Sequence, residues 1–112
     1  MISEHFTGEN LIITNVLTAK NASVKNWGSL VHRVYSDGWA CITIFGLYSV
    51  TANNVPVGTI NSHLPLWNVF GAAVLDDSGT SAVIQVNTDG NIYYIGPLNS
   101  NNIYATVWYR YI

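Results

Sequence analysis

The chain consists of short runs of β-branched and aromatic residues that are interrupted at close intervals by turn residues. Val, Ile, Thr, Tyr and Trp dominate these runs, and no segment shows the sustained i, i+3, i+4 apolar spacing of an amphipathic helix. Short strands separated by turns rich in Gly, Asn and Asp are typical of β-sandwiches and barrels. We therefore predict one all-β domain over residues 1–112, with residues 1–10 as an N-terminal connector.

The turn residues delimit about eight predicted strands. Ser36-Asp37-Gly38 predicts a hairpin between the runs on either side of it, and Gly46 predicts a bulge or a close backbone approach. Pro56 suits the start of an edge strand, and residues 21–28 are expected to form a polar connection. The predicted strands are Leu11–Thr18, Leu30–Tyr35, Trp39–Val50, Val57–Ile60, Val69–Leu75, Ser81–Val86, Asn91–Ile95 and Ile103–Tyr111.

Two of these strands are apolar on both faces, whereas a sheet with one face in water alternates apolar and polar residues. One face of each fills the core, and we expect a neighbouring subunit to cover the second face. A closed barrel with exposed aromatic residues is the alternative. In the longer strand the two faces carry Ala40, Ile42, Ile44 and Tyr48, and Trp39, Cys41, Phe45 and Leu47. The candidates for core or subunit contacts are Trp39, Phe45, Tyr104, Trp108, Tyr109 and Tyr111.

Charged residues make up only 9% of the chain, compared with roughly 25% in an average soluble domain. The net charge is −2 and no basic stripe is present, so neither nucleic acid nor an anionic membrane is an expected partner. Cys41 is the single cysteine and is expected to be a buried small hydrophobe. Residues 1–8 lack the features of a secretion signal, and no apolar run is long enough for a membrane-spanning helix.

Three segments resemble the C-terminal receptor-binding (head) domains of phage tail-fibre and baseplate proteins. Residues 55–60 (VPVGTI), followed by Leu64-Pro65, resemble a proline-glycine strand that leads into a Leu-Pro loop in that family. Residues 83–92 (VIQVNTDGNI) resemble its strand, Asp-Gly turn and strand, and residues 105–112 (ATVWYRYI) resemble its closing strand. The sequence departs from the family pattern after Leu64-Pro65, where many relatives carry a Gly-Tyr-Arg-Pro-like run.

The resemblance implies a jelly-roll-like antiparallel sandwich that forms a homotrimer at the tip of a phage or prophage tail. It also implies binding to bacterial cell-surface saccharide and contact with other tail or baseplate proteins. Release by lysis would account for the missing signal sequence, so the expected location is the virion, with action outside the cell.

Saccharide recognition requires an aromatic face for the C–H surface of a sugar and side chains that donate to and accept from its hydroxyls. The loop of residues 61–68 combines these residue types on a rigid β scaffold. Tyr93 and Tyr94 are adjacent in a strand and so point to opposite faces, and only one of the two is expected at a binding surface. The candidate saccharide-binding residues are His63, Trp67, Asn68, Asp89, Tyr93 and Tyr94.

Nothing in the sequence indicates catalysis, a metal or a cofactor. No nucleophile elbow, phosphate loop or His-Glu-x-x-His motif is present, and the acidic turn at residues 76–79 lacks the spacing of a calcium loop. His5, His32 and His63 are not spaced as zinc ligands. Alternatives to saccharide binding are a structural trimerisation or capping module without its own ligand, a small glycan-active enzyme domain, and a host-type trimeric signalling head.

Overall fold

The computed structural model describes residues 11–76, 81–99 and 102–112. Eight strands and no helix occur in these ranges, and so no helix there is long and apolar enough to cross a membrane. The expected connector at residues 1–10 and most of the expected turn at 76–79 lie outside the described residues. The strands are β1 (Leu11–Val16), β2 (Ser23–Tyr35), β3 (Trp39–Tyr48), β4 (Gly58–Thr59), β5 (Val69–Leu75), β6 (Ser81–Val86), β7 (Asn91–Ile95) and β8 (Ile103–Arg110).

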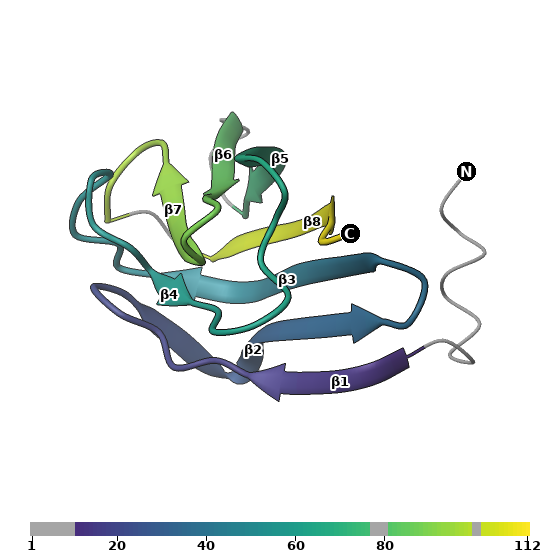
Figure 1. Cartoon of the computed structure of the whole chain (residues 1–112). Coiled ribbons are helices and arrows are strands. Elements are labelled where there is room, and N and C mark those ends of the chain that lie inside the picture. Colours follow the sequence, from purple (N-terminus) through teal and green to yellow (C-terminus); the bar gives the residue numbers. More distant parts are fainter. Residues whose placement is uncertain (1–10, 77–80, 100–101) are drawn as a thin grey trace.

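All eight strands belong to one antiparallel sheet with the order β1-β2-β3-β8-β5-β6-β7-β4. The sheet curls strongly into a half-barrel, so that β5, β6 and β7 rise above β8 while β1, β2 and β3 lie on its other side (Figure 1). β1 and β4 are its two edges. The prediction of an all-β domain with about eight strands is therefore confirmed, and the strands form one continuous curled sheet.

The predicted hairpin around Gly38 is confirmed, because β2 and β3 pair on either side of residues 36–38. Gly38 has a φ of 96°, the left-handed conformation that this short connection requires. The predicted polar connection at residues 21–28 is wrong from Ser23 onward. Ser23 and Val24 pair with Tyr48 and Leu47, because the long β3 offers backbone groups that a polar segment satisfies as well as an apolar one.

Gly46 forms the predicted irregularity in β3. It has a φ of 75°, and the pairing with β8 shifts register between Phe45 and Leu47. The extra residue turns Leu47 into the core, where it is fully buried. The sequence pattern grouped Leu47 with Phe45 and Tyr48 with Ile44, and strict alternation fails there because of this bulge.

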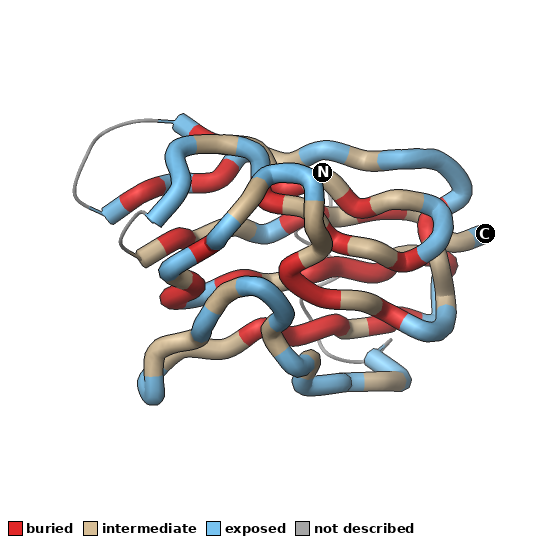
Figure 2. Tube along the Cα trace, turned by 90° about the vertical axis from the view of Figure 1, so that its left-hand side faces the viewer, coloured by how far each residue is buried: buried red, intermediate tan, exposed pale blue. Residues whose placement is uncertain are grey.

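The concave side of the curled sheet holds the core. Residues from both halves of the sheet pack there, and Figure 2 shows the buried segments gathered between the exposed outer turns. Cys41 is buried, as predicted. The fully buried members of this core include Val34, Ala40, Ile42, Leu47, Val50, Val57, Ile84, Val86, Ile92, Tyr94 and Ile103.

Candidate functional site

Apolar side chains line up across three neighbouring strands on the convex, outer face of the sheet. Phe45 on β3 is directly opposite Tyr104 on β8, which is in turn opposite Val74 on β5. Phe45 is 47% exposed and Val74 is 64% exposed. Register therefore brings together, on the water side of the sheet, residues of the kind that normally fill a core.

Trp27 extends this row from β2. Its ring meets Phe45 edge-on at 5.6 Å between centroids, and Phe45 meets Tyr104 in the same manner at 5.0 Å. Trp27 and Tyr104 are stacked at 6.5 Å. These separations lie within the range of favourable aromatic pairs. We call these three residues the aromatic cluster.

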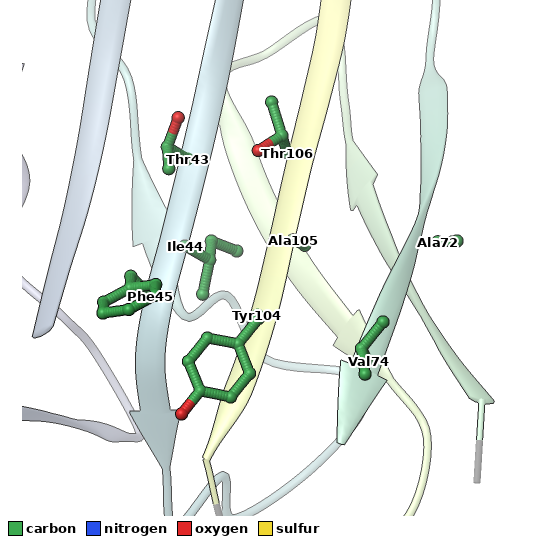
Figure 3. A pocket seen from close by; sticks show the side chains of 8 residues that line it. All are labelled: Thr43, Ile44, Phe45, Ala72, Val74, Tyr104, Ala105 and Thr106. Atoms are coloured by element: carbon green, nitrogen blue, oxygen red, sulfur yellow. The ribbon is translucent and has the colours of Figure 1, made fainter. Parts of the chain in front are cut away.

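A shallow hollow of about 450 Å³ adjoins the aromatic cluster, and we call it the outer hollow. Figure 3 shows Phe45 and Tyr104 at one end of it, Thr43 and Thr106 at the other, and Val74 across from Tyr104. Its lining contains no charged residue, so the hollow offers apolar contact and the hydroxyl groups of two threonines and one tyrosine. Its lining residues are Thr43, Ile44, Phe45, Ala72, Val74, Tyr104, Ala105 and Thr106.

The opposite end of the outer face carries the two arginines. Arg110 lies over the ring of Trp39 at 5.3 Å, and Arg33 Nη1 donates to Thr43 Oγ1 at 3.3 Å. Trp108 packs on Tyr35 with 5.5 Å between ring centroids. This end is therefore aromatic and cationic, and Arg33 reaches Thr43 at the edge of the outer hollow, whereas the residues that line the hollow are themselves uncharged.

The six residues predicted for core or subunit contacts divide into two groups. Tyr109 is 1% exposed and belongs to the core. Tyr111 is half-buried, packs against the core and donates from its hydroxyl to the Tyr35 carbonyl. The other four extend from the outer face and are half-buried or exposed, namely Trp39, Phe45, Tyr104 and Trp108.

The loop of residues 61–68 brings three saccharide candidates to one end of the half-barrel. Trp67 is 60% exposed, and Asn68 Oδ1 accepts a 3.0 Å hydrogen bond from the Thr88 backbone N–H. This bond joins the loop to the turn that contains Asp89. The ring of His63 meets that of Tyr111 edge-on at 4.8 Å, so it is packed rather than free.

The structure separates the two adjacent tyrosines. Tyr94 is fully buried and its hydroxyl donates to the Pro97 carbonyl at 2.7 Å. Tyr94 is therefore the member of the pair that lies in the core, because the alternation along β7 turns it inward, and it is not available to a saccharide at the surface. Tyr93 is opposite Gln85 on the outer face and is half-buried.

Asp89 has a structural role in its turn. Its Oδ1 accepts the Asn91 backbone N–H at 3.0 Å, and its Oδ2 accepts from Asn91 Nδ2 at 3.2 Å. Bonds of this kind are ordinary Asp chemistry in turns. Within the described ranges, no three His, Cys, Asp or Glu side chains gather as metal ligands.

A buried polar chain connects the core to the loop of residues 61–68. His32 Nε2 lies 2.7 Å from the Tyr109 hydroxyl, which donates to the His63 carbonyl at 2.6 Å. Burial, aided by the nearby His63, lowers the pKa of His32 from 6.5 to about 4. Burial also raises the pKa of Tyr109, so both groups are neutral at pH 7 and hold the loop through hydrogen bonds.

Sequence reasoning did not identify Val74, Ala72, Thr43 or Thr106 as parts of one surface. The signal was present in β5, where Phe70, Ala72 and Val74 share one face while Ala73 and Leu75 are buried on the other. β5 therefore carries apolar residues on both of its faces, as β3 and β8 do. No protein-family model and no curated protein matches this sequence.

Proposed function

We propose that this domain is a non-catalytic binding module that associates with copies of itself through its outer face and recognises host cell-surface saccharide. Its proposed setting is the receptor-binding head of a phage or prophage tail, as a homotrimer. The tail setting, the threefold symmetry and the jelly-roll-like arrangement all derive from the sequence resemblance. The packing of two halves of the sheet around one core is compatible with a sandwich-like head.

The observation that carries self-association is the aromatic cluster with its neutral outer hollow. Covering one half-exposed ring stabilises an assembly by on the order of 2 kcal/mol. The neighbouring outer-face positions Val74 and Phe70 are 64% and 62% exposed, which extends the apolar surface onto β5. A contiguous apolar patch of this kind is characteristic of interaction surfaces.

A sister copy is the proposed cover because the patch is neutral and the whole chain is poor in charge. Only 9% of the residues are charged, so this chain offers little electrostatic attraction to a highly charged partner. The end of the outer face with Arg33 and Arg110 would place like charges together if two copies overlapped there. Self-association is therefore assigned to the end with the outer hollow.

Saccharide recognition is assigned to the end of the half-barrel that carries the loop of residues 61–68. Trp67 offers an exposed ring, and the bond from Thr88 to Asn68 holds the loop against the neighbouring turn. The chain from His32 to the His63 carbonyl holds the loop from inside. An exposed aromatic side chain on a loop anchored in this way is a preorganised surface for a sugar ring.

Light scattering tests the association. We expect a mass of three times the 12.3 kDa chain at micromolar concentration. Val74→Asp should yield a folded monomer, because it places a charge in the outer hollow. Ile112→Asp is the matched control, since Ile112 is 70% exposed and follows the opposite end of β8. A monomeric wild-type protein would refute the proposed association.

Adsorption to host cells and a glycan array test the recognition. Trp67→Ala should weaken binding about tenfold, the effect of losing one aromatic contact of about 1.4 kcal/mol, without unfolding the domain. Leu98→Ala, in a different loop and 43% exposed, should bind as the wild type does. Trimeric protein that binds no glycan would instead favour a structural module, and hydrolysis of host polysaccharide would favour an enzyme.

A further inference from the structure

The half-barrel has an open seam between its edge strands, β1 and β4. The chain that leaves β1 crosses this seam at one end, where the Lys20 backbone N–H donates to the Val57 carbonyl at 2.9 Å. A hollow of about 290 Å³ lies beside this crossing, and we call it the seam hollow. Its lining residues are Val16, Leu17, Thr18, Lys20, Thr59 and Asn61.

The walls of the seam hollow are held by hydrogen bonds within the protein. Leu17 N–H donates to the Leu30 carbonyl at 2.8 Å, which fixes the wall after β1. Asn21 has a φ of 54° and donates from Nδ2 to the Pro56 carbonyl at 2.8 Å. Its backbone carbonyl accepts a hydrogen bond from the Thr51 N–H. The hollow therefore requires no ligand to take its shape, which reduces the entropy cost of binding.

A chain of side-chain hydrogen bonds orients the one charged group in the lining. Lys20 Nζ donates to Thr59 Oγ1 at 3.1 Å, and Thr59 Oγ1 donates to Asn91 Oδ1 at 3.0 Å. Asn91 Nδ2 in turn donates to Asp89 Oδ2 at 3.2 Å. The ammonium is thus held at the hollow, and this series of hydrogen bonds ends at the Asp89 carboxylate, two side chains beyond Thr59.

Donor groups remain available in the seam hollow. An ammonium has three N–H donors, and among the described residues Lys20 Nζ bonds only Thr59 and forms no ion pair. Within the same part of the chain, the side chains of Thr18 and Asn61 form no hydrogen bond. Val16 and Leu17 supply an apolar wall. A cation, a hydroxyl and an amide beside an apolar wall are complementary to a hydroxylated ring that carries an anionic group.

We propose that the seam hollow binds an acidic sugar residue, whose carboxylate or phosphate pairs with Lys20. Its hydroxyls bond Thr18 and Asn61, and its C–H surface packs on Val16 and Leu17. The volume is at the lower end of the roughly 300–1,000 Å³ of small-molecule sites, which suits one sugar residue. This assignment rests on the proposed saccharide recognition, and it specifies the acidic class of saccharide and a site separate from Trp67.

Titration calorimetry with three sugars tests the assignment on the full chain. The probes are methyl β-glucuronide, glucose 6-phosphate and the neutral methyl β-glucoside. We expect an acidic sugar to bind at least about tenfold more tightly than the neutral one, as expected for one added hydrogen bond to a charged group. The two acidic probes distinguish a carboxylate from a phosphate as the preferred anion.

Lys20→Gln should abolish the preference for the acidic sugar and leave folding intact, because Lys20 is exposed. Lys25→Gln is the matched control, since the Lys25 ammonium lies over the Tyr48 ring at 4.2 Å and does not line the seam hollow. Equal binding of all three sugars, or an unchanged preference in Lys20→Gln, would overturn the assignment to the seam hollow but not the proposed function. A wild-type protein that binds neither these sugars nor any array glycan would overturn the proposed function as well.

Discussion

His32 is the one buried polar or charged side chain among the described residues, and its bonding determines its protonation. The Tyr109 hydroxyl has one proton, which it donates to the His63 carbonyl. The Tyr109 oxygen therefore accepts a hydrogen bond from His32, so Nε2 carries the imidazole proton. A second proton on this ring would place a charge in the core without a counterion, which explains the lowered pKa.

This burial predicts an acid-dependent loss of stability. The pKa of His32 is about 4 in the folded chain and 6.5 when unfolded, so between these values the unfolded state binds the extra proton. The free energy of unfolding should therefore fall as the pH is lowered from 6.5 to 4. The expected loss is on the order of 2 kcal/mol after allowance for solvent screening, measured by urea denaturation across this range.

His32→Gln is the control for this prediction, because an amide can donate to Tyr109 but does not titrate. The unfolding free energy of the variant should depend less on pH between 6.5 and 4 than that of the wild type. The same pH slope in wild type and variant would show that the unfolding equilibrium is not linked to His32.

At the residue scale, the sequence predicted only in part which side chains are exposed and which are buried. Trp67 is exposed on its loop and Tyr109 is in the core. The choice between Tyr93 and Tyr94 required the strand register, which depends on pairing with β6. Lys20 and Thr59 were missed because the curl of the sheet brings together residues 39 positions apart, and no local pattern encodes that curl.

At the scale of elements, the bulge in β3 couples two surfaces. It turns Leu47 into the core, and it leaves Gly46 with no side chain beneath the Trp27 ring. A Cβ atom on Gly46 would lie 2.8 Å from Trp27 Cζ3. The same glycine therefore permits both the irregular backbone and the position of Trp27 in the aromatic cluster.

Gly46→Ala should therefore destabilise the domain for two separable reasons. The φ of 75° disfavours any residue with a Cβ atom by about 1–2 kcal/mol, and the contact with Trp27 adds to that cost. We expect a total loss of about 2–3 kcal/mol in urea unfolding. In a Trp27→Ala background, the same substitution should cost about 1 kcal/mol less, because only the backbone strain remains. Equal costs in the two backgrounds would show that the ring does not constrain Gly46.

The strand boundaries were predictable wherever turn residues bracket an apolar run. β5, β6 and β7 have the predicted bounds, because Gly, Asn and Asp mark their ends. The first half of β2 was missed because its side chains are polar, although its backbone pairs with β3. Pairing satisfies backbone groups whatever the side chains are, so composition alone did not reveal this part of the strand.

At the scale of the whole molecule, the all-β class followed from the sequence but the sheet order did not. Placing β8 between β3 and β5 requires pairings between segments far apart in the chain. These long-range choices are made by how the strands close around one core, which no local motif records. The apolar outer face was predictable, because β3 and β8 carry apolar residues on both of their faces.

The proposed association makes a last prediction that links folding to assembly. If the copies bury their outer faces against one another only when folded, the melting temperature must rise with protein concentration. Hundredfold dilution of a trimer should lower the stability of each chain by about 2 kcal/mol, which is several degrees in Tm for a chain of this size. Val74→Asp should melt at one temperature at all concentrations, whereas Ile112→Asp should retain the dependence. Calorimetry from 1 to 100 μM measures this, and a wild-type Tm that does not change over that range would mean that the aromatic cluster faces water in the native protein.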